Sequence, residues 1–194
     1  AEFDDLFASV ASVTGSMTRL FPSVPNNTKP ISVLQIHGTA DSTVKYLGDV
    51  ASYDIDYVLN YWKSHNNTSL IPIIDSIPNI STSDNCDAKR YTYGGGTNNT
   101  EVIHYKVFDG AHTWPGAPFS IGVTNQDFNA SEVIWQFFDK HPRSSSLSVQ
   151  EIQDDSKFQI VYQSLLKELL IANKNQFSNT RYRVINALGQ TVNE

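Results

Sequence analysis

Two short motifs in this sequence carry side chains that could do acid–base chemistry together. Asp41 closes the run HGTAD at residues 37–41, and His112 lies within DGAHTWPG at residues 109–116. An aspartate that accepts a hydrogen bond from Nδ1 of a histidine fixes the tautomer of the imidazole and stabilises the imidazolium. The histidine then carries a proton from a nucleophile to a leaving group. Asp41 and His112 are therefore the candidate catalytic residues, as acid and base of a Ser-His-Asp triad.

Each of these residues also has a simpler interpretation. An aspartate after a strand commonly caps a turn or the following helix, and a loop histidine commonly bonds a backbone carbonyl. Trp114 and Tyr46 are candidates for the wall of a substrate pocket, where an aromatic ring stacks on an aromatic or sugar ring. Alternatively, both only stiffen their loops. His37 is interpreted as a strand-end histidine with satisfied hydrogen bonds rather than as a second base.

The nucleophile of such a triad does not occur in the sequence. There is no G-x-S-x-G motif, the strained strand-to-helix turn that exposes the serine of α/β-hydrolases. Ser16 and Ser42 stand in other contexts. We therefore expect the nucleophile and the oxyanion-hole amides to lie upstream of Ala1, and the chain as given to be inactive.

The residue types do not favour a cofactor. His104, Asp109 and His112 form no H-x-x-x-H or similar pair, so their spacing is not that of a metal site. A Ser-His-Asp triad needs no metal or organic cofactor, and we expect none. Cys86 is the only cysteine, which excludes a zinc ribbon and a disulfide within this chain. A disulfide with a cysteine outside the chain remains open.

Composition places the chain among globular proteins. It has 194 residues, of which 40% are hydrophobic and 18% charged, enough for one good-sized domain and a small addition. A net charge of −6 without a Lys/Arg cluster argues against a nucleic-acid partner. No apolar run approaches the roughly 18 residues that cross a bilayer, so no transmembrane segment is predicted.

The elements that must position the two motifs follow from hydrophobic periodicity. Strands are predicted over 7–13, 31–37 and 101–108, shorter strands near 71–74 and 90–93, and helices over 51–64 and 129–140. The order strand, strand, helix, strand, helix predicts an α/β fold, a parallel sheet with flanking helices and right-handed crossovers. In such sheets functional side chains follow the carboxyl ends of strands, which is where Asp41 and His112 lie.

These residues resemble a known family. The runs HGTADSTVKY at 37–46 and GAHTWPG at 110–116 look like the polyhydroxybutyrate depolymerase/feruloyl esterase family of α/β-hydrolases. LFASVASVTGSM at 6–17 is similar to the strand that follows the nucleophile helix in that family, and IWQFF at 134–138 resembles its closing helix. The resemblance covers residues 1–141 and implies the C-terminal part of an α/β-hydrolase fold, with Asp41 as triad acid and His112 as triad base.

A second resemblance concerns the end of the chain. Residues 142–157 have the composition of a linker. Beyond it, ELLI at 168–171 and YRVINALGQTV at 182–192 look like the start of a type IX secretion sorting domain, a small β-sandwich. Its usual Pro-Asn-Pro signature is absent, with VYQSL at 161–165 in that place, and its second half is missing. The resemblance implies an incomplete β domain over 158–194 and export through the secretion machinery.

Together these features predict a secreted or cell-surface serine esterase. The partner is expected to be an ester-bearing polymer or its oligomers, with feruloyl or acetyl-xylan esters of plant polysaccharide as the leading class. An extracellular polyhydroxyalkanoate depolymerase is the alternative within the family. A non-catalytic surface or carbohydrate-binding protein on the same fold is the alternative from another class, because fold alone does not fix activity.

Overall fold

The computed structural model describes residues 7–20, 29–119, 122–142, 158–163 and 168–173. The chain divides into two compact units, Ala1–Ser144 and Ser145–Glu194, and each is described by itself. The first unit has an α/β architecture, and the second contains a β-hairpin.

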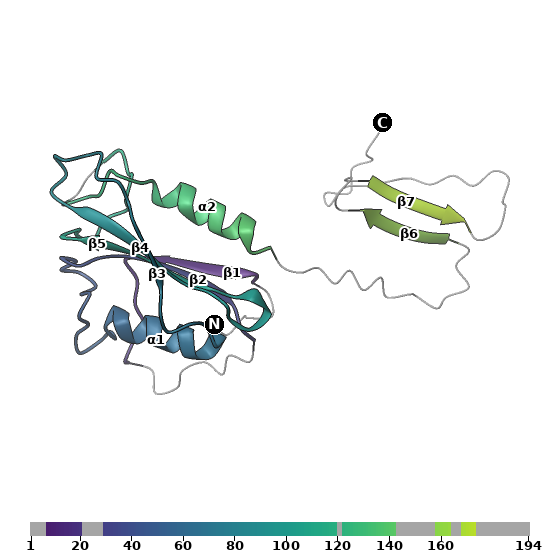
Figure 1. Cartoon of the computed structure of the whole chain (residues 1–194), viewed down its shortest axis with the longest axis horizontal. Coiled ribbons are helices and arrows are strands. Elements are labelled where there is room, and N and C mark those ends of the chain that lie inside the picture. The colour runs from purple at the N-terminus through teal and green to yellow at the C-terminus, as the bar shows by residue number, and fades with distance from the viewer. Residues whose placement is uncertain (1–6, 21–28, 120–121, 143–157, 164–167, 174–194) are drawn as a thin grey trace. The chain divides into compact units, whose positions relative to one another are not determined.

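A five-stranded sheet forms the centre of the first unit (Figure 1), in the order β1-β2-β5-β4-β3. Its strands are β1 (Ser9–Val13), β2 (Ser32–Gly38), β3 (Ile73–Ser76), β4 (Asp87–Tyr93) and β5 (Val102–Phe108). Strand β2 is buried along its whole length, as expected for a central strand covered on both faces. The strands β1, β2 and β5 run parallel, as predicted.

The prediction of an entirely parallel sheet is wrong at one edge. Strand β4 runs antiparallel to β5, and β3 antiparallel to β4. Residues 94–101, which join β4 to β5, hold only the short 3₁₀ helix η1 (Thr97–Asn99). A return to the same end of the sheet needs a crossover of a dozen or more residues, whereas a short connection permits only antiparallel pairing. The sheet is therefore mixed.

Two helices cover opposite faces of this sheet (Figure 1): α1 (Ile55–Asn66) and α2 (Ala130–Lys140). Side chains alternate along β2, so Val33 packs with α1 while Leu34 and Ile36 pack with α2. Strand β5 alternates in the same way. The result is a three-layer arrangement with one apolar cluster on each face of the sheet.

The first helix begins later than its sequence pattern predicts. Asp54 is its N-cap and accepts a hydrogen bond from the Tyr57 amide at 2.7 Å, so the segment before it is not helical. The buried face consists mainly of Ile55, Val58, Leu59 and Trp62, whereas Tyr57 is exposed. The second helix begins where expected, after Asn129, whose side chain accepts from the amides of residues 131 and 132.

The second unit contains an antiparallel hairpin of β6 (Phe158–Gln163) and β7 (Glu168–Asn173). The run ELLI at 168–171 lies within β7. The run YRVINALGQTV at 182–192 lies outside the described residues. Within the described ranges, no helix is both long and apolar enough to cross a bilayer.

Candidate active site

The candidate site lies where two neighbouring parallel strands end. Strands β2 and β5 pair up to Gly38 and Val107, and the loops that follow them are joined by three hydrogen bonds. The amides of Thr39 and Ala40 donate to the carbonyls of Val107 and Gly110 at 2.8 and 3.0 Å. In return, the amide of Asp109 donates to Oγ1 of Thr39 at 2.8 Å. The two segments that carry Asp41 and His112 are therefore hydrogen-bonded directly to each other.

Glycine at both strand ends allows this close approach. A Cβ atom on Gly38 would lie 2.1 Å from the carbonyl oxygen of Gly110, and one on Gly110 would lie 2.5 Å from Cγ1 of Val107. Backbone this close leaves no room for any side chain at residue 38. The sequence pattern identified the strand ends but not this contact between glycines.

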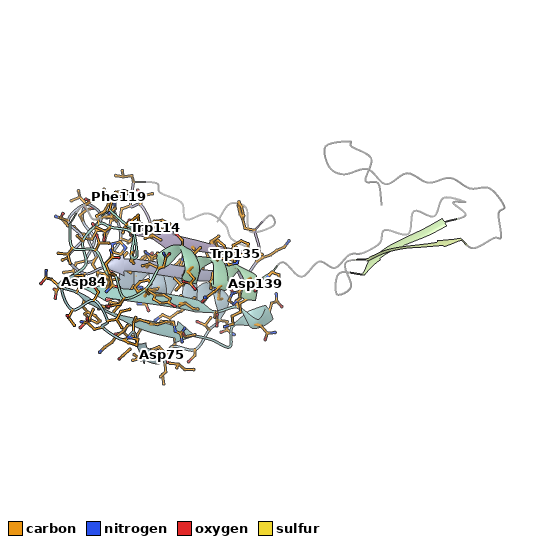
Figure 2. The ribbon with its side chains drawn as sticks, turned by 90° about the horizontal axis from the view of Figure 1, so that it is seen from above. Asp75, Asp84, Trp114, Phe119, Trp135 and Asp139 are labelled. Atoms are coloured by element: carbon orange, nitrogen blue, oxygen red, sulfur yellow. The ribbon has the colours of Figure 1, made fainter. Side chains whose placement is uncertain are left out.

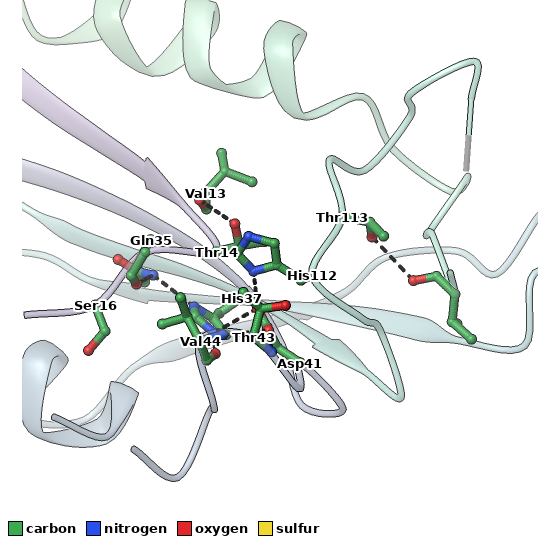
Figure 3. A network of polar contacts seen from close by, with 12 residues as sticks. Val13, Thr14, Ser16, Gln35, His37, Asp41, Thr43, Val44, His112 and Thr113 are labelled. Carbon is green, nitrogen blue, oxygen red and sulfur yellow. Dashed lines mark hydrogen bonds and ion pairs between the residues drawn. The ribbon is translucent and has the colours of Figure 1, made fainter. Parts of the chain in front are cut away.

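Asp41 and His112 meet across these loops (Figure 3). Nδ1 of His112 lies 2.9 Å from Oδ2 of Asp41, a distance typical of a hydrogen bond to a carboxylate. Because a carboxylate only accepts, this contact places the proton of a neutral His112 on Nδ1. The Asp41 side chain is fully buried, while that of His112 is 39% exposed. The contact that the sequence predicted is present.

The two oxygens of Asp41 have separate partners. Oδ1 accepts from the amides of Thr43 and Val44 at 2.8 and 2.9 Å, which closes the turn after β2. Oδ2 faces His112. One oxygen of Asp41 therefore caps a turn, and the other contacts a histidine.

The loop that carries His112 is fixed on both sides. The amide of Ala111 and the hydroxyl of Thr113 donate to the carbonyl of Val123 at 2.9 and 3.2 Å. The amide of Gly116 donates to the carbonyl of Asn125 at 2.8 Å. Among the residues that the structure describes, Nε2 of His112 has no hydrogen-bond partner. A fixed imidazole with Nδ1 on a carboxylate and Nε2 open is the arrangement that a general base requires.

His37 lies behind the aspartate and is fully buried. Its Nε2 is 2.8 Å from the carbonyl of Val44 and 3.4 Å from Oδ2 of Asp41, and its Nδ1 is 3.3 Å from Nε2 of Gln35. Burial lowers the pKa of His37. The hydrogen bonds of His37 are satisfied, as predicted, but the sequence did not reveal how close His37 lies to Asp41.

The two predicted pocket residues have different placements. Tyr46 is buried, and its hydroxyl lies 3.2 Å from Oδ1 of Asp56 and 3.3 Å from Nε2 of His104. The expectation that Tyr46 walls a pocket is not met, because its ring packs in the α1 cluster instead. Trp114 is half-exposed (Figure 2), and its indole N–H donates to Oγ of Ser131 at 3.1 Å. This bond anchors the Trp114 ring at the first turn of α2.

The serines of the chain near this site are not placed as nucleophiles. The hydroxyl of Ser16 donates to the carbonyl of Tyr53 at 2.5 Å and points away from His112 (Figure 3). Ser42 is exposed on the turn that Asp41 closes. Cys86 is buried under α2, and burial raises the pKa of its thiol to about 11, so it stays protonated.

The described residues hold no group of three or more His, Cys, Asp or Glu side chains arranged for a metal ion. His104, considered above with Asp109 and His112, is buried in β5, where Nδ1 donates to the carbonyl of Gln35 at 3.1 Å. Burial lowers the pKa of His104 to about 3. His104 is therefore a neutral core residue.

No model of a protein family matches the chain, and no curated protein matches it significantly.

Proposed function

We propose that this chain supplies the acid and base of a serine esterase, with Asp41 as the acid and His112 as the base. The observation that supports this is the 2.9 Å contact between Nδ1 of His112 and Oδ2 of a fully buried Asp41, on a ring 39% exposed and open at Nε2. The order of acid before histidine along the chain is that of the α/β-hydrolases. The mixed sheet with helices on both faces is compatible with part of that fold.

In this mechanism His112 removes the proton of a serine hydroxyl through Nε2 while the hydroxyl oxygen attacks the ester carbonyl. Asp41 holds Nδ1–H and stabilises the imidazolium that forms. The imidazolium then gives its proton to the leaving alkoxide, which departs and leaves an acyl-enzyme. Water repeats the sequence on the acyl group and releases the acid. The sequence contains no G-x-S-x-G, so the serine in this proposal comes from outside residues 1–194.

The proposed substrate is a carboxylic ester on a plant polysaccharide, of the feruloyl or acetyl-xylan type. Half-exposed Trp114, two residues after His112 in the same loop and anchored to Ser131, offers an aromatic face for such a substrate. An extracellular polyhydroxyalkanoate depolymerase is the alternative substrate class. The resemblance of residues 158–194 to a sorting domain supports export of the protein through the type IX machinery.

The experiment begins with the reading frame upstream of Ala1. A G-x-S-x-G on a strand-to-helix pattern there would supply the nucleophile. The protein that joins this segment to residues 1–194 is then assayed on aryl acetate, methyl ferulate, acetylated xylan and polyhydroxybutyrate. Ester turnover that disappears in the His112→Ala variant supports the proposal. Binding to xylan without turnover would favour the non-catalytic carbohydrate-binding protein instead.

A further inference from the structure

The aspartate of the site faces two imidazoles, not one. Nε2 of His37 lies 3.4 Å from the same Oδ2 atom that Nδ1 of His112 approaches to 2.9 Å (Figure 3). His37 lies on β2, four residues before Asp41, and its side chain is fully buried. It is thus a group that reaches the candidate acid without touching any substrate.

The hydrogen bonds around His37 fix its tautomer. The side-chain amide nitrogen of Gln35 donates to the carbonyl of Gly15 at 2.8 Å, which fixes the orientation of that amide. The same nitrogen is 3.3 Å from Nδ1 of His37 and can only donate, so Nδ1 accepts. The proton of His37 therefore lies on Nε2, where the carbonyl of Val44 accepts it at 2.8 Å. Oδ2 of Asp41 lies 3.4 Å from the same nitrogen, as a nearby charge and not as its hydrogen-bond acceptor.

The surroundings keep His37 in this neutral form. The titratable groups that face it are Asp41, Tyr46, whose ring meets it edge-on with centroids 5.9 Å apart, and more distantly His104 and His112. Burial lowers the pKa of His37. A neutral His37 can keep its Nε2–H on the carbonyl of Val44, next to the carboxylate, without competing with His112 as a base.

We propose that His37 is a positioning residue, which holds Asp41 toward His112 through the turn that its Nε2–H closes at the carbonyl of Val44. The inference rests on the proposed function for its importance to catalysis, but its geometry concerns the Asp41–His112 contact alone. The amides of Thr43 and Val44 hold Oδ1 of Asp41, and His37 holds the carbonyl of Val44 in the same turn. A turn fixed at Val44 keeps Oδ1 on its amides and leaves Oδ2 directed at His112.

The test compares two amide side chains of different reach in the ¹⁵N-labelled 194-residue chain. Nε2 of a glutamine can occupy the position of Nε2 of His37, whereas the amide of an asparagine reaches only as far as Nδ1. His37→Gln should preserve the downfield Nδ1–H proton signal of His112. His37→Asn should raise the exchange rate of that proton about fivefold, as loss of the buried hydrogen bond to the Val44 carbonyl implies. Equal exchange rates in the two variants would overturn the proposal.

Two further measurements allow the proposal to be tested even if a His37 variant misfolds or the protein has no esterase activity. In the unmodified chain, long-range ¹H–¹⁵N spectra should show His37 protonated at Nε2 near neutral pH. A proton on Nδ1 would overturn the proposal without any variant. His104→Phe removes another buried histidine of the same sheet and should leave the His112 signal unchanged. These measurements need no ester and no nucleophile. Failure of the esterase assay would therefore not affect the result on His37, and a negative result on His37 would not affect the esterase assay.

Discussion

Two carboxylate–histidine pairs lie at opposite ends of β5, and only one has the form of an acid–base site. Before the strand, Oε1 of Glu101 lies 3.2 Å from Nε2 of His141. Beyond its other end, Oδ2 of Asp41 lies 2.9 Å from Nδ1 of His112. Both carboxylates are buried, with side chains no more than 10% exposed.

The pairs differ in what the second ring nitrogen does. Nδ1 of His141 lies 2.8 Å from the carbonyl of Phe137, and Lys140 shares Oε1 of Glu101 at 2.7 Å. Both nitrogens of His141 thus face acceptors, and its ring closes the C-terminus of α2. His112 keeps Nε2 open on a ring 39% exposed. A contact with a carboxylate orients a histidine, and only an open second nitrogen lets it exchange protons with a substrate.

The largest expected difference between the pairs is in ester turnover. In the protein that carries both this chain and its serine, His112→Ala should lower kcat about 10⁴-fold or more, on the scale of triad variants. His141→Ala should leave kcat within about twofold, because a helix-capping residue at the other end of β5 affects stability and not the transition state. Initial rates on an aryl acetate measure both. Similar losses in the two variants would remove the distinction.

Gly38 offers a way to separate Asp41 from His112 without touching either. Gly38→Ala would place a Cβ 2.1 Å from the carbonyl of Gly110, and we expect it to cost about 3 kcal/mol of unfolding free energy. Gly94→Ala is the matched control, because nothing lies within 4 Å of its added Cβ. Urea unfolding of the 194-residue chain measures both. Equal midpoints for the two variants would contradict the close approach.

Glu101 tests the other pair. Glu101→Gln removes the charge that Lys140 and His141 share. It should lower the unfolding free energy by about 1.5 kcal/mol, mainly through the contact with the buried His141, since the Lys140 side chain is 64% exposed and its pair contributes little. The downfield Nδ1–H signal of His112 should not change. A lost His112 signal in a chain that remains folded would show that the two ends of β5 are coupled.

His104 lies on β5 between the two pairs. Its environment predicts that the folded chain loses stability in acid. Burial lowers its pKa from 6.5 to about 3, so between these values the unfolded chain binds a proton that the folded chain does not. Stability is therefore complete above about pH 6.5 and falls as pH decreases, by up to about 1.4 kcal/mol per pH unit. Urea unfolding at several pH values measures this slope. His104→Gln should flatten it, and an unchanged slope would exclude His104 as the source.

The smallest expected effect concerns Trp114. Trp114→Ala should raise KM for an aromatic ester several-fold, about 1 kcal/mol of binding, with kcat largely retained, because a stacking face contributes to binding of substrate and transition state alike. Trp135→Ala, which removes the exposed Trp of α2, is the control. A KM that changes equally in both variants would remove Trp114 from the substrate site.

Sequence patterns predicted the pairing of Asp41 with His112 because hydrophobic runs mark strand ends, and neighbouring parallel strands bring their carboxyl ends together. They did not predict the antiparallel β3–β4 edge, since strand periodicity carries no direction and the length of the connection decides it. Tyr46 was misplaced because an aromatic residue after a strand suits a pocket and a core equally well. The contact of His37 with Asp41 depends on the shape of the turn at residues 41–44, which no spacing rule specifies.

The glycine contact at the end of β2 and β5 has a consequence for protein design. To transplant this acid and base onto another pair of parallel strands, a designer would copy Asp41 and His112 first, yet those two side chains alone would not meet. The distance between the backbones at Gly38 and Gly110 decides whether an aspartate can reach an imidazole from the next loop. A design should therefore transfer both loops together with their glycines. These glycines set the backbone distance that brings the aspartate and the histidine into contact.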